Sequence, residues 1–143
     1  MTITDSTTTA SPVDVLNTFF EKLGAGDLPG LLDVIDENVD WKAAGDPRVP
    51  WTGQRHGRAA AGDFLASLGQ YTEPVSFTVD RVLGDADTAV AVGAFAHRVL
   101  GTGKTFESEF VIQIGVVDGC IVRYRIFEDS YAVGQAFLPD NQG

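Results

Sequence analysis

The amino-acid sequence predicts a single α+β domain in which helices cover one face of an antiparallel sheet. Two observations lead to this fold class. The first half of the chain carries apolar residues at helical spacing, and the second half carries four strand-like runs separated by glycine-containing turns. Helices that precede an antiparallel meander pack on one face of its sheet. The length of 143 residues suits one domain, which we expect at residues 12–138, between tails at 1–11 and 139–143.

The predicted helices have recognisable start and stop signals. Ser11 can cap a helix that begins at Pro12, and the Gly-Ala-Gly run at 24–26 ends it. Asp27 can cap a second helix, which we expect to run to about Ile35. After it the sequence predicts, in order, a short strand at 39–44, a glycine- and proline-containing loop up to 57, and a third helix at 58–68.

The second half of the chain is typical of four strands and a short final helix. Runs rich in β-branched and aromatic residues lie between Gly-Asp, Gly-Thr-Gly and Asp-Gly turns. The expected strands span 75–83, 88–100, 104–117 and 120–128. Aspartate is a favoured N-cap, so we expect Asp129 to cap a helix at 130–137 rather than to act in a site.

The last hairpin decides which face of the sheet is inside. A two-residue Asp118-Gly119 turn would set Ile112 beside Arg125, whereas a three-residue loop at 117–119 shifts the register by one. We expect the three-residue loop, because it keeps apolar and charged residues on separate faces. The inward face then holds Phe110, Ile112, Ile114, Val122, Tyr124 and Ile126. The outward face holds Glu107, Glu109, Gln113, Arg123 and Arg125.

Composition excludes several classes of function. The net charge is −10 and the few basic residues are not clustered, which disfavours a nucleic-acid partner. No run approaches the roughly 20 apolar residues of a membrane span, and no signal peptide is visible, so we expect a cytoplasmic protein. Cys120 is the only cysteine, which excludes an internal disulfide and gives no metal cluster. We expect neither a metal nor a cofactor.

The order and spacing of these elements resemble the SnoaL-like group of the nuclear-transport-factor-2-like superfamily, which also contains ketosteroid isomerase and limonene epoxide hydrolase. The resemblance covers residues 12–137, and its most telling segments are Ala25-Gly26-Asp27, Trp51–Gly57, Gly103-Lys104 and Asp118–Asp129. It implies a cone-shaped, cystatin-like fold with a curved antiparallel sheet packed against three N-terminal helices. It also implies a ligand pocket between sheet and helices, and a homodimer formed through the outer sheet face.

Most catalytic residues of these relatives are replaced in this chain. By the resemblance, the oxyanion-stabilising tyrosine and the general-base aspartate of the isomerase fall at Phe19 and Ala43, and its second oxyanion donor falls near Ile112. The acid/base aspartate of the polyketide cyclases falls at Ile126, where the epoxide hydrolases also need an aspartate. The isomerase mechanism is therefore not expected.

His97 and Tyr124 are the predicted catalytic residues. The paired arginine and aspartate of the hydrolases fall at Phe95 and His97, so only His97 keeps a titratable group. An imidazole exchanges protons near neutral pH, and the Tyr124 phenol could donate to a ligand carbonyl or to His97. Either side chain could instead be a hydrogen-bonded part of the core. The residues expected to contact the ligand, or to be plain core, are Phe19, Trp41, Trp51, Phe95, Phe110, Ile112 and Ile126.

Three functions follow as hypotheses. The first is an enzyme that acts on a hydrophobic, polyketide- or terpenoid-like molecule by cyclisation, isomerisation or related proton transfer. The second is a non-catalytic binding protein for an apolar metabolite, and the third is a structural dimer whose pocket is filled by side chains. In a homodimer, the outer-face residues Glu109, Val111, Arg123 and Arg125 would be partly covered. Arg55 and His56 are expected to be solvated in the loop before the third helix.

Overall fold

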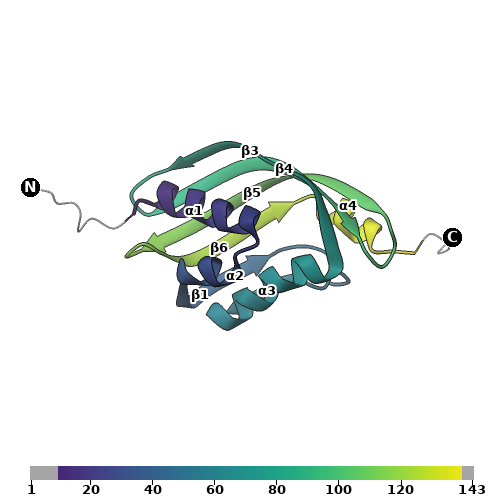
Figure 1. The fold of residues 1–143 in the computed structure, drawn as a ribbon, viewed down its shortest axis with the longest axis horizontal. Coiled ribbons are helices and arrows are strands. Elements are labelled where there is room, and N and C mark those ends of the chain that lie inside the picture. Colours follow the sequence, from purple (N-terminus) through teal and green to yellow (C-terminus); the bar gives the residue numbers. More distant parts are fainter. Residues whose placement is uncertain (1–9, 140–143) are drawn as a thin grey trace, which may run out of the picture.

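The computed structural model describes residues 10–139, so most of both predicted tails lies outside the described residues. The elements run in the order α1 (Pro12–Ala25), α2 (Leu28–Asp33), β1 (Ile35–Ala43), β2 (Gly53–His56), α3 (Arg58–Tyr71), β3 (Thr72–Gly84), β4 (Thr88–Val99), β5 (Thr105–Val117), β6 (Cys120–Glu128) and α4 (Ser130–Ala136) (Figure 1). None of the described helices is long and apolar enough to cross a membrane.

The strands form one curved sheet in the order β2-β1-β6-β5-β4-β3, and α1, α2 and α3 lie on the same face of it (Figure 1). Strand β1 pairs with β6 in parallel, and every other neighbouring pair is antiparallel. The short helix α4 packs against β5 at the far end of the sheet. The predicted α+β fold class is confirmed, with the parallel β1–β6 pair as an addition to the expected meander.

The predicted helix caps are present. The Ser11 hydroxyl accepts a hydrogen bond from the Asp14 N–H at 3.2 Å, and the Asp27 carboxylate accepts one from the Gly30 N–H at 2.9 Å. The Asp129 carboxylate accepts one from the Ala132 N–H at 3.0 Å, so this residue does cap α4. These contacts fix the starts of three helices and hence the loops that lead into them.

Several predicted boundaries are wrong: α3 runs to Tyr71 instead of 68, and β3 begins at Thr72 instead of 75. The second helix ends at Asp33, and β1 already begins at Ile35. Ile35 and Val39 are both fully buried, whereas Glu37 between them is exposed, and a register shift lies between Ile35 and Asp40. Buried residues four apart with an exposed residue midway are typical of a helix, because residues four apart share a helix face. Residues 53–56, expected in a loop, form β2 by pairing with β1.

The last hairpin keeps the predicted faces but reaches them by another route. The turn has only two residues, Asp118 and Gly119, both with positive φ (52° and 77°), as its type requires. A register shift between Gly115 and Val116 then pairs Ile112 with Ile126, whereas the expected three-residue loop would pair it with Tyr124. The two registers differ by two residues, so Ile112, Tyr124 and Ile126 share one face in both. Because of this bulge, Ile121 rather than Val122 is the fully buried residue next to the turn.

Candidate functional site

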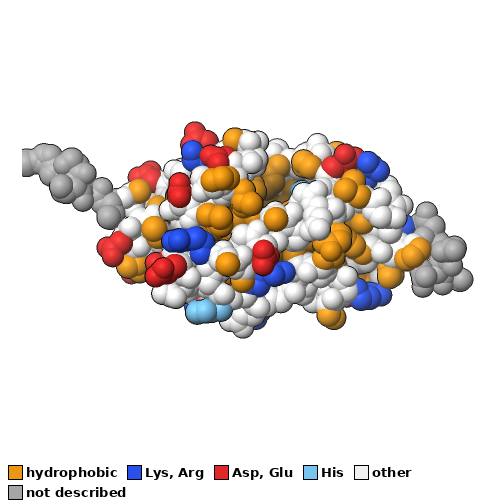
Figure 2. All heavy atoms as spheres, turned by 60° about the horizontal axis from the view of Figure 1, so that its bottom comes forward, with side chains coloured by type: hydrophobic (Ala, Val, Ile, Leu, Met, Phe, Trp, Pro, Cys, Tyr) orange, Lys and Arg blue, Asp and Glu red, His pale blue; other side chains and the backbone are white. Residues whose placement is uncertain are grey.

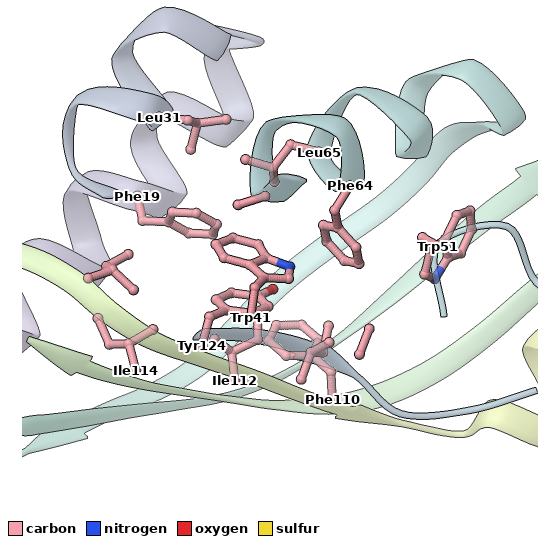
Figure 3. Close-up of a cluster of buried hydrophobic side chains, with 14 of the residues drawn as sticks. Phe19, Leu31, Trp41, Trp51, Phe64, Leu65, Phe110, Ile112, Ile114 and Tyr124 are labelled. Carbon is pink, nitrogen blue, oxygen red and sulfur yellow. The ribbon is translucent and has the colours of Figure 1, made fainter. Parts of the chain in front are cut away.

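An aromatic cluster fills the space between the sheet and the helices (Figure 3). The rings of Trp41 on β1 and Tyr124 on β6 are stacked, with centroids 3.7 Å apart and planes at 8°. Phe19 from α1 and Phe64 from α3 pack on this pair, with centroid distances to Tyr124 of 5.8 and 6.2 Å. Burial raises the pKa of the Tyr124 phenol, so its hydroxyl stays protonated at neutral pH and acts as a donor.

A second stack of aromatic rings extends from the interior toward β3. Phe110 lies between Phe77 and Phe95, with centroid distances of 5.3 and 5.4 Å and nearly parallel rings. Gly93 makes room for it, because a Cβ at this position would come within 2.8 Å of the Phe110 ring. Phe20 on α1 packs on Phe77, which is 40% exposed, so the stack reaches the surface. Figure 2 shows hydrophobic side chains gathered around a hollow on the helix-covered side of the molecule.

Glu128, at the end of β6, is a functional candidate that the sequence reasoning missed. It is paired with Phe110, and it continues the inward alternation of Tyr124 and Ile126. Burial raises the pKa of the Glu128 carboxyl to about 7, although a hydrogen bond from the Trp51 side chain lowers it in part. Extending the inward face by two residues would have found this carboxyl.

His97 is held by a threonine hydroxyl and by aromatic rings. Its Nδ1 lies 3.0 Å from Thr72 Oγ1, and that hydroxyl also donates to the Leu68 carbonyl at 2.6 Å. Both contacts are hydrogen bonds only if Nδ1 carries the proton, which leaves the Nε2 lone pair free to accept one. The imidazole stacks on Phe106 with centroids 5.8 Å apart, and burial lowers its pKa. His97 is therefore neutral at pH 7.

The structure does not bring His97 and Tyr124 together. Tyr124 is paired with Ile114, which is paired with Ala89, and His97 follows Ala89 by eight residues on β4. This separation is roughly 26 Å of strand. The direct hydrogen bond that the sequence allowed between the two side chains is not made. Glu128 lies between them, level with Phe110 and Gly93.

The remaining predicted ligand residues fall into two groups. Phe19 and Trp41 lie in the cluster around Tyr124, whereas Phe95 lies beside His97, with ring centroids 5.5 Å apart. Trp51 packs edge-on against Phe137 and hydrogen-bonds to Glu128, which places it at the α4 end of the interior. The buried side chains of Phe110, Ile112 and Ile126 complete the inward face between the two groups.

Arg55 departs from its prediction. It lies on β2, paired with Trp41, and cross-strand partners point to the same face of a sheet. Its guanidinium carbon lies 5.9 Å from the centroid of the Phe64 ring, and its Nε is buried. This arginine therefore faces the aromatic interior rather than open solvent.

A hollow of about 570 Å³ lies along β3, β4 and β5, and Phe95 and Ser108 line it together with residues of the outer face. Hydroxyl, carboxylate and small side chains from β3, β4 and β5 line it, among them Ser76, Thr78, Ala94, Ala96, Glu107 and Glu109. Within residues 10–139, no group of three His, Cys, Asp or Glu side chains is arranged to hold a metal ion.

Comparison with known proteins finds a matching domain family and solved structures with the same architecture. The SnoaL-like domain family matches residues 16–124. Among solved structures, an NTF2-like protein of Burkholderia xenovorans is 27% identical, with a TM-score of 0.79 over 92% of this chain and 99% of that one. A Bacillus subtilis protein provisionally described as an isomerase is 26% identical, with a TM-score of 0.75 over 88% and 91%. TerC, co-crystallised with polyporic acid, is 20% identical, with a TM-score of 0.75 over 88% and 98%.

Proposed function

This chain belongs to the SnoaL-like domain family, and on that premise we propose that it catalyses proton transfer on a hydrophobic small molecule. The proposed substrate is polyketide- or terpenoid-like, and the reaction is a cyclisation, an isomerisation or a related step that needs no cofactor. Glu128 is the proposed acid and base, and the aromatic interior binds the substrate. Glu128 would supply the acid/base carboxyl that is missing at Ala43 and Ile126, the positions where the relatives carry an aspartate.

The observation that carries this proposal is the environment of Glu128. A carboxyl with a pKa of about 7 is close to half protonated at neutral pH. It can then take a proton from a substrate carbon and return it to another atom, which is the most favourable condition for general acid–base catalysis. An ordinary surface glutamate, with a pKa of roughly 4.3, would be a much weaker base.

Two further residues have proposed roles in the same reaction. The Tyr124 hydroxyl is a buried donor and would stabilise negative charge on a substrate oxygen. His97 offers a free Nε2 lone pair and would accept a proton at the opposite end of the inward face. Apolar walls that exclude water strengthen each of these interactions. The descriptions of the relatives support this reading, because one is provisionally an isomerase and another was crystallised with an organic acid.

A proton-exchange assay tests the proposal without a known substrate. A general base in an apolar site should accelerate the exchange of α-protons of cyclic ketones such as 2-tetralone in D₂O, followed by NMR. We expect Glu128→Gln to lower this rate by about 10²–10⁴-fold, the usual contribution of a general acid or base. Glu37→Gln, at an exposed carboxyl on β1, serves as the matched control and should keep the wild-type rate. Equal rates in the wild type and in Glu128→Gln would remove Glu128 from the mechanism.

Non-catalytic binding of an apolar metabolite is the second candidate function. The close Trp41–Tyr124 stack favours it, because a flat aromatic surface binds apolar molecules without any chemistry. A binding protein would show a change of ligand affinity in Glu128→Gln but no exchange activity in the wild type.

We also propose that the protein is a homodimer through the outer sheet face. Val92, Val111 and Phe127 are cross-strand neighbours on β4, β5 and β6, so they form one apolar row on that face. Val92 and Phe127 are 36% and 51% exposed. A second copy would cover this row, and the hollow beside it, with the same surface of its own.

A further inference from the structure

Two buried N–H donors of the aromatic interior have no hydrogen-bond partner among the described residues. They are Nε1 of Trp41 and Nε of Arg55. The Trp41 side chain is completely buried, so water does not satisfy its indole. Folded proteins pair nearly all of their buried polar groups, and an unpaired donor costs free energy. Two such donors in one place therefore need an explanation.

The two donors lie side by side. Trp41 and Arg55 are direct partners in the β1–β2 pair and share its inward face. Both side chains also pack on the same ring: Trp41 lies 5.4 Å from Phe64 between centroids, and the Arg55 guanidinium carbon lies 5.9 Å from that centroid. In Figure 3 the indole nitrogen of Trp41 is directed to the side on which Phe64 lies. The two donors therefore belong to the same part of the interior, beside the Phe64 ring.

No carboxylate within residues 10–139 forms an ion pair with this arginine. By contrast, Arg48, Arg98 and Arg125 are each paired with a carboxylate. Asp40, next to Trp41 in sequence, is on the other face of the sheet and is bound by Arg125 at 2.9 Å. The Phe64 ring attracts the guanidinium, but an aromatic face is a weaker acceptor than an anionic oxygen.

We propose that Trp41 and Arg55 form a subsite for an anionic oxygen, a carboxylate or enolate, carried by an otherwise apolar ligand. The inference rests on the proposed function in one respect, namely that the interior admits a small molecule. Indole and guanidinium are donors only, so together they select an acceptor and favour a charged one. Tyr124 is level with Trp41, and Glu128 follows Tyr124 by four residues on β6, so a ligand held by the subsite would extend from it toward Glu128.

Calorimetric titration with a matched pair of probes, 4-phenylbutyrate and 4-phenylbutyramide, tests the subsite. Both probes share the apolar body, and only the first carries an anionic oxygen. The wild type should bind the carboxylate about tenfold or more tightly than the amide, as expected for a charge-assisted hydrogen bond. In Arg55→Met, which keeps the apolar stem, the ratio should fall to about one. Arg55→Lys should keep part of it, and Trp41→Phe should lower it several-fold.

Controls separate this proposal from the proposed function. Arg81→Met, at an exposed arginine on β3, should keep the wild-type preference. The preference should also persist in Glu128→Gln, so the subsite can stand even if the exchange assay removes Glu128 from catalysis. Equal binding of the two probes to the wild type, or no binding of either at millimolar concentration, would overturn the subsite. An unchanged preference in Arg55→Met would do the same.

Discussion

The Glu128 carboxyl accepts a hydrogen bond from the Trp51 side chain, and this contact joins the last strand to the loop before β2. The indole N–H can only donate, so the bond favours the carboxylate. Burial acts in the opposite direction and is stronger, which leaves the pKa of Glu128 at about 7. The Glu128 carboxyl, bound by Trp51, therefore gains and loses a proton near neutral pH.

Replacing Glu128 by glutamine should reduce the dependence of the unfolding free energy on pH. The folded-state pKa of about 7 lies above that of an unfolded glutamate, so the folded state keeps a proton that the unfolded chain has lost. The stabilisation is complete below the unfolded pKa of roughly 4.3 and disappears as the pH rises through 7. Relative to Glu128→Gln, the wild type should lose about 1–3 kcal/mol across this window, measured by urea unfolding at several pH values. Glu37→Gln should follow the wild type, and a difference that stays constant with pH would contradict the assignment.

Trp41→Phe should be far less destabilising than Trp41→Ala. The phenyl ring keeps the stack on Tyr124, and no hydrogen bond is lost because Nε1 has no partner among the described residues. We expect less than about 1.5 kcal/mol for Trp41→Phe and about 3–5 kcal/mol for Trp41→Ala, measured by chemical denaturation. Similar losses in both variants would mean that the indole N–H does hold a partner.

The fold could be predicted from the sequence because its signals are local. Three helix starts are predicted by a capping residue in the adjacent sequence: Ser11, Asp27 and Asp129. Each of these side chains makes the expected capping hydrogen bond. The bulge near Val116 could not be predicted, because a two-residue turn with a bulge and a three-residue loop give the same faces further along the hairpin.

The site was harder to predict, because its key contacts join distant parts of the chain. Tyr124 and Trp41 were expected in the interior and do lie there. No sequence pattern predicts that Arg55 pairs with Trp41 across β1 and β2. Similarly, nothing local links Glu128 to Trp51. The sequence does not single out Glu128, because a carboxylate at the end of a strand usually faces solvent. Only the packing around it gives its pKa an unusual value.

His97→Asn should lower stability and slow proton exchange less than Glu128→Gln does. The variant loses the stack on Phe106 and weakens the bond to Thr72, together about 1–2 kcal/mol, which a thermal melt would detect. In the 2-tetralone assay it should keep most of the wild-type rate. A loss of about 10²–10⁴-fold in His97→Asn, with Glu128→Gln unaffected, would transfer the acid–base role to His97.

Phe127→Glu should turn a dimer into a monomer. The substitution places a charge in the apolar row formed with Val92 and Val111 on the outer face, where a second copy would have to bury it. Light scattering after size-exclusion chromatography would show the change in mass. Tyr131→Glu, at an aromatic side chain that is 74% exposed on α4, should leave the mass unaltered. A wild-type monomer at micromolar concentration would refute the proposed dimer.

The central claim is that the Glu128 carboxyl gains and loses a proton near pH 7. The most direct test is a pH titration of the Trp51 indole N–H by ¹H–¹⁵N NMR. The chain has two tryptophans, so Trp41→Phe assigns the two indole signals. The Trp51 signal should shift along a single titration curve with a midpoint near pH 7, because the Glu128 carboxyl that it binds changes charge there. This shift should vanish in Glu128→Gln and persist in Glu37→Gln. A Trp51 signal that stays constant through pH 7, or that titrates near the ordinary glutamate value of roughly 4.3, would contradict the account.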